Sequence, residues 1–285
     1  MQTPPERFGA YGLTITGIKA AKQGLGPALR HWPELHLDQA RMVPTDDRAP
    51  FMDAERAFLR VGRNQAIAIE REQRRATVLS PSDRGSAELI HPFLSVPAAT
   101  FARWEERAAV HGGAFVANGF AWGVFGEKHA GKSTALAALA LEGVPIVTDD
   151  LVIVDRGLML AGPRQIDLRP GAARQFALPP GLETVRRRLR LTPTPSEPEV
   201  PVGGWIFLKW GRPAGLRRLD RREALVRLAG QYVLAPALGP SPVSLLELAS
   251  YPALELRRPR SFAAIAQTTR WLAALDTPPL ERSAA

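Results

Sequence analysis

Eight consecutive residues match the pattern G-x-x-x-x-G-K-[ST] of phosphate-binding loops: Gly126, Glu127, Lys128, His129, Ala130, Gly131, Lys132 and Ser133. In such a loop, backbone N–H groups and the start of the following helix surround a phosphate, whose negative charge the helix dipole favours. Lys132 would supply a cation to the β- and γ-phosphates, and the Ser133 hydroxyl would ligate Mg²⁺. The pattern predicts binding of ATP and Mg²⁺, with Thr134 completing the phosphate-binding segment.

The flanking residues supply the strand and the helix that this loop needs on its two sides. Ala121 to Phe125 is an apolar run that predicts a strand, and Asn118-Gly119 predicts a hairpin turn that joins it to residues 114–116. Lys132 to Leu141 is rich in alanine and leucine and predicts a helix that Gly143 ends. The motif therefore has the strand–loop–helix context in which it binds phosphate.

His129 stands where many phosphate-binding loops have glycine, and its Cβ would be strained if the backbone there had a positive φ. The side chains of Lys128 and His129 have two interpretations, as additional phosphate contacts or as solvated loop side chains.

Two adjacent carboxylates, Asp149 and Asp150, follow the strand predicted at Val144 to Val147. A strand beside a phosphate-binding loop commonly ends in an acidic residue that helps to hold Mg²⁺. Neighbouring residues of an extended chain point in opposite directions, so one carboxylate can serve the metal while the other faces a substrate hydroxyl as a base. The alternative is a pair that only forms a turn or a cap after the strand.

Together these segments resemble the core of HPr kinase/phosphorylase and its shorter kinase-like relatives. The resemblance rests on His111-Gly112-Gly113, on the loop, and on Val147 to Val154, which contains the aspartate pair. Ile166 to Pro170 is similar to a further signature of that family, and the resemblance covers residues 105–180. It implies an α/β fold, with a P-loop kinase core of the HPr kinase type and a β-rich N-terminal region.

The resemblance also implies roles for single residues. Asp149 would be the general base toward the acceptor hydroxyl, with His111 beside it tuning its charge, and Lys132 would act on the transferred phosphate. Arg169 would lie near the phosphates or the acceptor. The Mg²⁺ ligands would be Ser133, Asp150 and Asp167, the last in place of the family's glutamate. The sequence leaves open whether Asp149 and Asp150 exchange their roles.

The composition excludes several classes of site. The 285 residues include no cysteine, which excludes disulfides, thiolate metal sites and cysteine nucleophiles. Neither a membrane-spanning apolar run nor a secretion signal is evident, so we expect no membrane partner and a cytoplasmic location. The net charge of +9 favours a partner such as nucleotide or an acidic peptide. No known motif supports nucleic acid as the partner.

The hydrophobic pattern divides the chain into a β-rich N-terminal region at 1–100 and a P-loop kinase domain at 101–285. The N-terminal strands are predicted at Tyr11 to Thr16, Phe58 to Val61, Ala66 to Ile69 and Ala76 to Leu79. Later strands are predicted at Leu151 to Val154 and Gly204 to Trp210, and helices at Pro97 to Ala109, Arg221 to Leu228 and Phe262 to Leu275. The proline-rich stretch Thr192 to Pro201 is predicted to be an exposed loop or disordered linker.

These features favour a kinase that transfers the γ-phosphoryl group of ATP to a serine or threonine hydroxyl of a peptide or small protein. Some of the relatives that the chain resembles phosphorylate a serine of a ribosomally made precursor peptide. The arginine-rich run 186–190 either contacts an acidic acceptor or forms a solvated helix face. The alternatives are a kinase for a small-molecule hydroxyl and a non-catalytic nucleotide-binding regulator, and a homo-oligomer is compatible with each.

Overall fold

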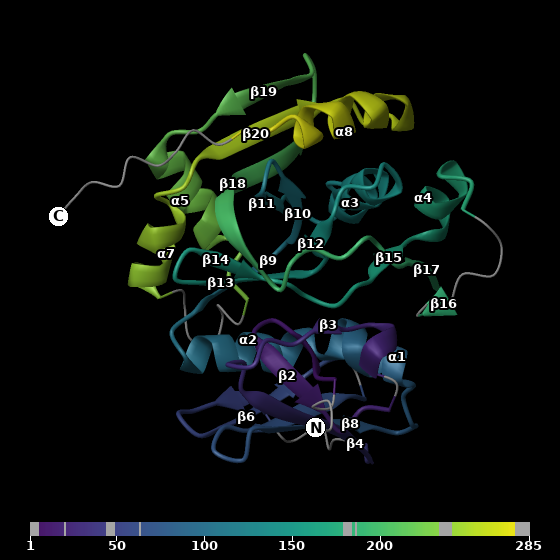
Figure 1. Cartoon of the computed structure of the whole chain (residues 1–285), viewed down its shortest axis with the longest axis vertical. Helices are drawn as coiled ribbons and strands as arrows, with labels where there is room; N and C mark the ends of the chain where they lie inside the picture. Colours follow the sequence, from purple (N-terminus) through teal and green to yellow (C-terminus); the bar gives the residue numbers. More distant parts are fainter. Residues whose placement is uncertain are drawn as a thin grey trace, which may run out of the picture.

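The structure is a computed structural model that describes residues 6–19, 21–43, 49–62, 64–178, 184–185, 187–233 and 241–276. The described residues have a mixed α/β fold of three sheets and seven α-helices. Figure 1 shows the two large sheets stacked along the long axis of the molecule with a layer of helices between them.

The first sheet is formed by eight strands in the order β3-β1-β2-β4-β8-β7-β6-β5. The strands are β1 (Phe8–Ala10), β2 (Leu13–Thr16), β3 (Gly26–Pro27), β4 (Glu34–Arg41), β5 (Phe51–Met52), β6 (Arg56–Arg60), β7 (Ala66–Glu70) and β8 (Arg75–Ser80). A 3-10 turn, η1 (Ala21–Gln23), precedes β3. The strands predicted at 66–69 and 76–79 are confirmed as parts of β7 and β8, and the one predicted at 58–61 is confirmed over 58–60 in β6.

The helical layer consists of α1 (Ser86–Glu88), the π-helical turn η2 (Leu89–Phe93) and α2 (Ser95–Trp104). Phe101 of α2 shares a buried cluster with Ile67 of the first sheet and Ile153 of the second. This layer therefore joins the two sheets through one apolar core. The predicted helix at 97–109 is wrong beyond Trp104, because Glu106 has a φ of 61° and the chain enters a strand at Ala108.

The second sheet carries the glycine-containing loop at 126–133 and the aspartate pair at 149–150. Its main path is β12-β10-β11-β18-β14-β13-β9, with β20 paired to β18 and β19 paired to β20. The strands are β9 (Ala108–His111), β10 (Gly113–Ala117), β11 (Phe120–Phe125), β12 (Ile146–Thr148), β13 (Leu151–Asp155), β14 (Leu158–Leu160), β18 (Glu199–Trp210), β19 (Gly215–Arg218) and β20 (Ala253–Arg258). Since β18 runs parallel to both β11 and β20, the carboxyl ends of these three strands meet at one edge.

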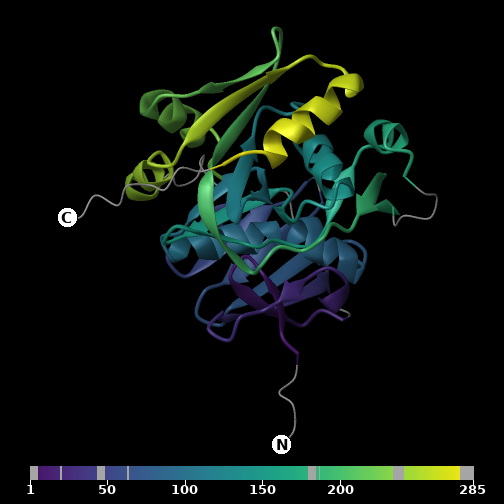
Figure 2. The same cartoon turned by 45° about the horizontal axis from the view of Figure 1, so that its top comes forward.

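Helices cover both faces of this sheet because alternate residues of its central strand point to opposite sides. Trp205 of β18 packs in a cluster with residues of α5 (Arg221–Ala229) and α7 (Pro242–Leu248). The next residue, Ile206, packs with α3 (Lys132–Leu141) and α8 (Ile265–Ala273). Figure 2 shows the two helix pairs on opposite sides of β18 and β20, with the short turn η3 (Phe262–Ala264) leading into α8.

A third, small sheet has the order β15-β17-β16 and extends beside α3 together with α4 (Pro170–Gln175) (Figure 1). Its strands are β15 (Ile166–Leu168), β16 (Thr184–Val185) and β17 (Arg188–Leu191). The helix considered for the arginine-rich run 186–190 is therefore wrong over residues 188–190, which form a strand, and Arg186 lies outside the described residues. Thr192 to Pro201 is also not a disordered linker, because the Thr194 and Pro198 carbonyls accept backbone hydrogen bonds and β18 starts at Glu199.

None of the described helices is long and apolar enough to cross a membrane. The division of the chain at residue 100 stays a prediction, and α2 runs across that position.

Candidate functional site

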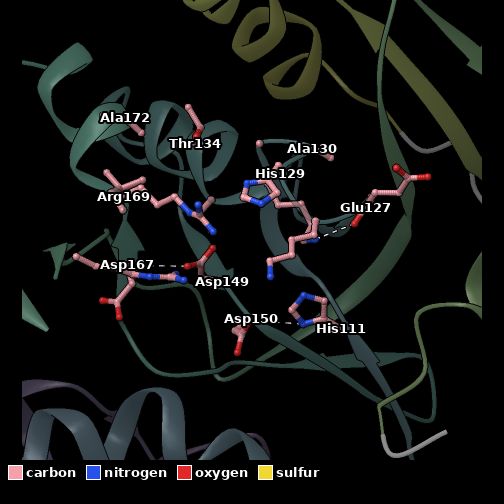
Figure 3. Close-up of a pocket in the computed structure, with 18 of the residues that line it drawn as sticks. His111, Glu127, His129, Ala130, Thr134, Asp149, Asp150, Asp167, Arg169 and Ala172 are labelled. Atoms are coloured by element: carbon pink, nitrogen blue, oxygen red, sulfur yellow. Dashed lines mark hydrogen bonds and ion pairs between the residues drawn. The ribbon is translucent and has the colours of Figure 1, made fainter. Parts of the chain in front are cut away.

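A cavity of about 900 Å³ opens where β11 and β12 end (Figure 3). Every residue with a site role predicted from the sequence lines it: His111, Gly126, Glu127, Lys128, His129, Ala130, Gly131, Lys132, Ser133, Thr134, Asp149, Asp150, Asp167 and Arg169. Seven further residues complete the lining: Leu168, Gly171, Ala172, Arg188, Gly230, Gln231 and Arg260. The fold thus brings residues from seven separate segments of the chain around one space.

The loop between β11 and α3 has an unusual backbone. Gly126 and Gly131 have φ values of 149° and 82°, which glycine adopts easily. His129 has a φ of 70°, a left-handed conformation that carries strain in a residue with a Cβ. Strain of this kind persists only where surrounding contacts hold the backbone in place. The positive φ that the sequence analysis considered for His129, and the backbone strain that goes with it, are therefore present in the structure.

The Lys132 side chain folds back over the loop. Its Nζ donates to the Gly126 carbonyl oxygen at 2.8 Å. Burial lowers the pKa of Lys132, and the carboxylates of Asp150 and Asp149 partly oppose that shift. The ammonium group is therefore positioned within the loop, next to the two acidic side chains.

Asp149, directly after β12, is a buried carboxyl group that is 8% exposed. Burial, reinforced by the charge of Asp150, raises its pKa to about 7, while the nearby Ser133 hydroxyl lowers it. Its Oδ2 accepts from the Asp167 backbone N–H at 3.4 Å, whereas its buried Oδ1 has no partner in the described part of the chain. A buried carboxylate oxygen without a partner, beside a hydroxyl group, is suited to a divalent cation.

Asp150 points to the more open side of the cavity. Its Oδ1 lies 3.5 Å from His111 Nδ1, as the dashed line in Figure 3 shows, and its side chain is 39% exposed. The family resemblance implies that His111 lies beside Asp149, but its ion-pair partner in the structure is Asp150. The reason is the register of β13 and β9, which puts Leu151 opposite His111 and so brings the preceding residue next to the imidazole.

Asp167 is held by Arg190, a residue that no sequence motif connects with it. Arg190 donates to Asp167 Oδ1 at 2.7 Å and to Oδ2 at 3.1 Å, and it also binds the carbonyl oxygens of Ala87 and His91. All three of Asp167, Arg190 and His91 are buried, and burial lowers the pKa of His91. Both Asp167 oxygens thus accept from a guanidinium, and the expected ligation of Mg²⁺ by Asp167 stays a prediction.

We expect Arg190→Met to destabilise the protein by about 3–5 kcal/mol, since it leaves the Asp167 carboxylate buried without its partner. Urea unfolding measures the effect. Arg188→Met is the matched control, because it lies two residues earlier on the same strand with an exposed side chain. The control should stay within about 0.5 kcal/mol of the wild type. A loss below about 1 kcal/mol in Arg190→Met would contradict a structural role for this ion pair.

The raised pKa of Asp149 predicts a pH-dependent stability. The group stays protonated in the folded protein up to about pH 7, against a usual pKa of 3.8. Between these values the folded state binds more protons than the unfolded state, so this group's contribution to stability falls as the pH rises. We compare the free energy of unfolding of metal-free Asp149→Asn with that of the wild type. We expect it to increase relative to the wild type between about pH 5 and pH 7, by up to about 1.4 kcal/mol per pH unit. A difference that does not change with pH in urea titrations would contradict the burial of this charge.

The remaining lining residues carry no local motif. Arg188 comes from β17, Arg260 from the segment after β20, and Gln231 from the turn that follows α5. The Gln231 carbonyl accepts from the His111 backbone N–H at 2.6 Å, which fixes this segment beside Asp150 and His111.

No protein-family model and no curated protein sequence matches this chain. Among solved structures, the chain is similar to the HPr(Ser) kinase/phosphatase from Coxiella burnetii, with 11% sequence identity and a TM-score of 0.30. The similarity covers 57% of this chain and 93% of that structure. A TM-score of this size supports no argument about activity, so the functional proposal depends on the geometry of the cavity.

Proposed function

We propose that this chain is an ATP- and Mg²⁺-dependent kinase that transfers the γ-phosphoryl group to a hydroxyl. The observation that carries the proposal is the convergence, in one cavity, of Lys132, Ser133 and the two carboxylates Asp149 and Asp150. A glycine-framed loop at a helix N-terminus, a lysine and two acidic groups are the parts that phosphoryl transfer requires.

The phosphates of ATP would lie against the loop and the start of α3. Lys132 would exchange the Gly126 carbonyl for the β- and γ-phosphate oxygens, a short movement because its Nζ already lies within the loop. This replaces a neutral hydrogen-bond partner by an anionic one, which strengthens the interaction.

Ser133 and Asp149 are the residues that would hold Mg²⁺. The described residues contain no group of three His, Cys, Asp or Glu side chains that could form a complete metal site. Mg²⁺ suits such a site, since it usually retains several waters and binds through one or two protein groups together with substrate phosphates. When bound, the ion would neutralise charge on the phosphates, and it would also satisfy the Oδ1 of Asp149, which has no partner among the residues that the structure describes.

Asp150 is the better candidate for the general base. It lies on the open side of the cavity, where a hydroxyl can approach, and its Oδ1 is 3.5 Å from His111 Nδ1. This proposal exchanges the roles that the sequence resemblance implied for the two aspartates. Asp150 would accept the proton of the acceptor hydroxyl as the phosphoryl group moves to that oxygen.

We further propose a serine or threonine of a peptide or small protein as the acceptor, as the sequence resemblance implies. Arg169, Arg188 and Arg260 line the cavity and could bind carboxylates of an acidic segment in a bidentate manner.

The test is incubation of the protein with γ-labelled Mg-ATP and a panel of acceptors. The panel holds peptides with internal or C-terminal Ser or Thr, acidic and neutral versions of each, and free serine, sugars and nucleosides. Mass spectrometry should detect a phosphate on a peptide in the wild type and not in Asp150→Asn. Phosphorylation of a small metabolite alone would support the small-molecule kinase, and tight ATP binding without any transfer would support the regulator.

A further inference from the structure

Two side chains that do not line the cavity bind three consecutive carbonyl groups of the loop from the side away from the cavity. The Trp210 indole N–H donates to the His129 carbonyl oxygen at 3.1 Å. Arg258 Nη2 donates to the carbonyl oxygens of Ala130 at 2.9 Å and Gly131 at 3.3 Å. We call Trp210 and Arg258 the carbonyl clamp. Its two members pair in register at the ends of β18 and β20, so the sheet itself fixes their spacing.

Arg258 is an unusual cation. It is 3% exposed, its guanidinium lies 4.4 Å from the centre of the Trp210 ring, and burial lowers its pKa to about 10. Within the described part of the chain its Nε is buried without a hydrogen-bond partner, and its Nη2 binds carbonyl oxygens rather than a carboxylate. Burying a charge without a counter-ion is costly. The positive charge of Arg258 lies next to the loop and attracts an anion bound on the opposite side of it. This attraction can offset the cost of burying the guanidinium.

The clamp determines which way the loop's N–H groups point. In a trans peptide the carbonyl oxygen of one residue and the N–H of the next lie on opposite sides. With the Ala130 carbonyl held by Arg258, the Gly131 N–H is directed to the cavity side. The Gly131 carbonyl, which also accepts from the Ala135 N–H at 3.0 Å, directs the Lys132 N–H in the same way. These groups begin α3, where N–H groups have no helical acceptor and are available to an anion.

The fit between clamp and loop is close. A Cβ on Gly131 would lie 2.8 Å from Arg258 Nη2, so the glycine permits both the positive φ and the approach of the guanidinium. A loop released from the clamp could rotate these peptides and present carbonyl oxygens to the ligand, which would repel a phosphate.

We propose that Trp210 and Arg258 are positioning residues that organise the loop for a phosphate chain before the nucleotide binds. This inference rests on the proposed function and adds to it two residues distant in sequence from the motif. The ligand they serve is the polyphosphate of a nucleoside triphosphate rather than its base or sugar.

The experiment compares the full-length wild type with Arg258→Gln, Arg258→Lys and Trp210→Phe by calorimetric titration with Mg-ATP and Mg-pyrophosphate. We expect Arg258→Gln to lose about 10- to 100-fold in affinity for both ligands, the size of a lost hydrogen bond involving a charged group. Arg258→Lys keeps the charge but cannot reach both carbonyls, so it should recover part of the loss. Trp210→Phe keeps the ring and loses the N–H, and a loss of about 3- to 10-fold is expected.

Arg257→Gln is the matched control, since it removes the same charge from the neighbouring residue of β20, whose side chain pairs with Glu255. Its affinities should stay within about twofold of the wild type. Amide hydrogen exchange in the free proteins supplies a second readout. The Ala130 and Ala135 N–H groups donate to the Glu127 and Gly131 carbonyl oxygens, and their exchange should accelerate in the clamp variants while core amides keep their rates.

Wild-type affinity and exchange in Arg258→Gln would overturn the clamp, as would an equal loss of affinity in Arg257→Gln. If Arg258→Gln does not fold, Trp210→Phe and Arg258→Lys decide by the same criteria. If the wild type binds neither Mg-ATP nor pyrophosphate, the proposed function fails, and the exchange data on the free proteins still decide whether the clamp orders the loop.

Discussion

We expect Lys132→Ala to abolish phosphoryl transfer and to lower the affinity for Mg-ATP on the order of 100-fold. Lys132 contributes the ammonium group that already lies within the loop, 2.8 Å from the Gly126 carbonyl oxygen, and it would follow the β- and γ-phosphates during transfer. Hydrogen bonds to charged groups contribute about 1.5–3 kcal/mol each, and this cation would contact more than one phosphate oxygen. Calorimetry measures the binding loss, and transfer of label from γ-labelled ATP measures the catalytic loss.

The same substitution should leave the fold intact. Burial lowers the pKa of Lys132, so removing the ammonium relieves a desolvation cost while it removes one hydrogen bond. The unfolding free energy should stay within about 1 kcal/mol of the wild type, which separates loss of function from loss of structure. Lys209→Ala is the matched control, as this exposed lysine on β18 does not line the cavity. Unchanged Mg-ATP binding by folded Lys132→Ala would show that the loop does not bind nucleotide phosphates.

Local sequence signals predicted the part of the site that depends on local structure. The Asn118-Gly119 turn joins β10 and β11 as expected, and α3 spans the predicted residues Lys132–Leu141. These elements follow from the positive φ that glycine allows and from helix propensity, which act within a few residues. The loop, α3 and the strand before Asp149 could therefore be placed from the sequence, and with them most of the cavity lining.

Contacts between distant segments could not be predicted in the same way. Arg190 meets Asp167 across 23 residues, and Arg258 meets Ala130 across 128, because β15 pairs with β17 and β20 lies beside β18. Nothing in the sequence near Arg258 distinguishes it from the other arginines of this arginine-rich chain.

At two places the sequence contains a local strand signal that the predictions above did not use. Residues 188–191 alternate arginine and leucine, which is the period of a strand rather than of a helix. Their charge favours a solvated helix face when the sequence is considered alone, whereas in the structure Arg190 is buried and Arg188 lines the cavity. In the same way Leu35 and Leu37 of β4 alternate with polar residues, and this strand was not among those predicted.

Substitution of Asp149 and substitution of Asp150 should have different effects on activity. Asp150→Asn is expected to keep Mg-ATP affinity within a few-fold and to lower kcat by about 10²- to 10⁴-fold, the size of a lost general base. Asp149→Asn is expected to raise the Mg²⁺ concentration needed for half-maximal activity at least about 10-fold, because a carboxylate ligand is lost from a site with few protein ligands. The measurements are kcat over a titration of free Mg²⁺ and calorimetric binding of Mg-ATP by each variant.

The structure gives a physical reason to expect this assignment rather than its reverse. Asp149 is buried beside Ser133, and no described residue partners its Oδ1, so a cation there would stabilise the ionised form that burial disfavours. Asp150 is open to the cavity and 3.5 Å from His111, so His111→Asn, which removes a neighbour of the base, should lower kcat less than Asp150→Asn. If Asp149→Asn instead loses kcat at saturating Mg²⁺ while Asp150→Asn changes only the Mg²⁺ requirement, Asp149 is the base and Asp150 serves the metal. The Mg²⁺ titration therefore decides between the two arrangements that adjacent carboxylates allow.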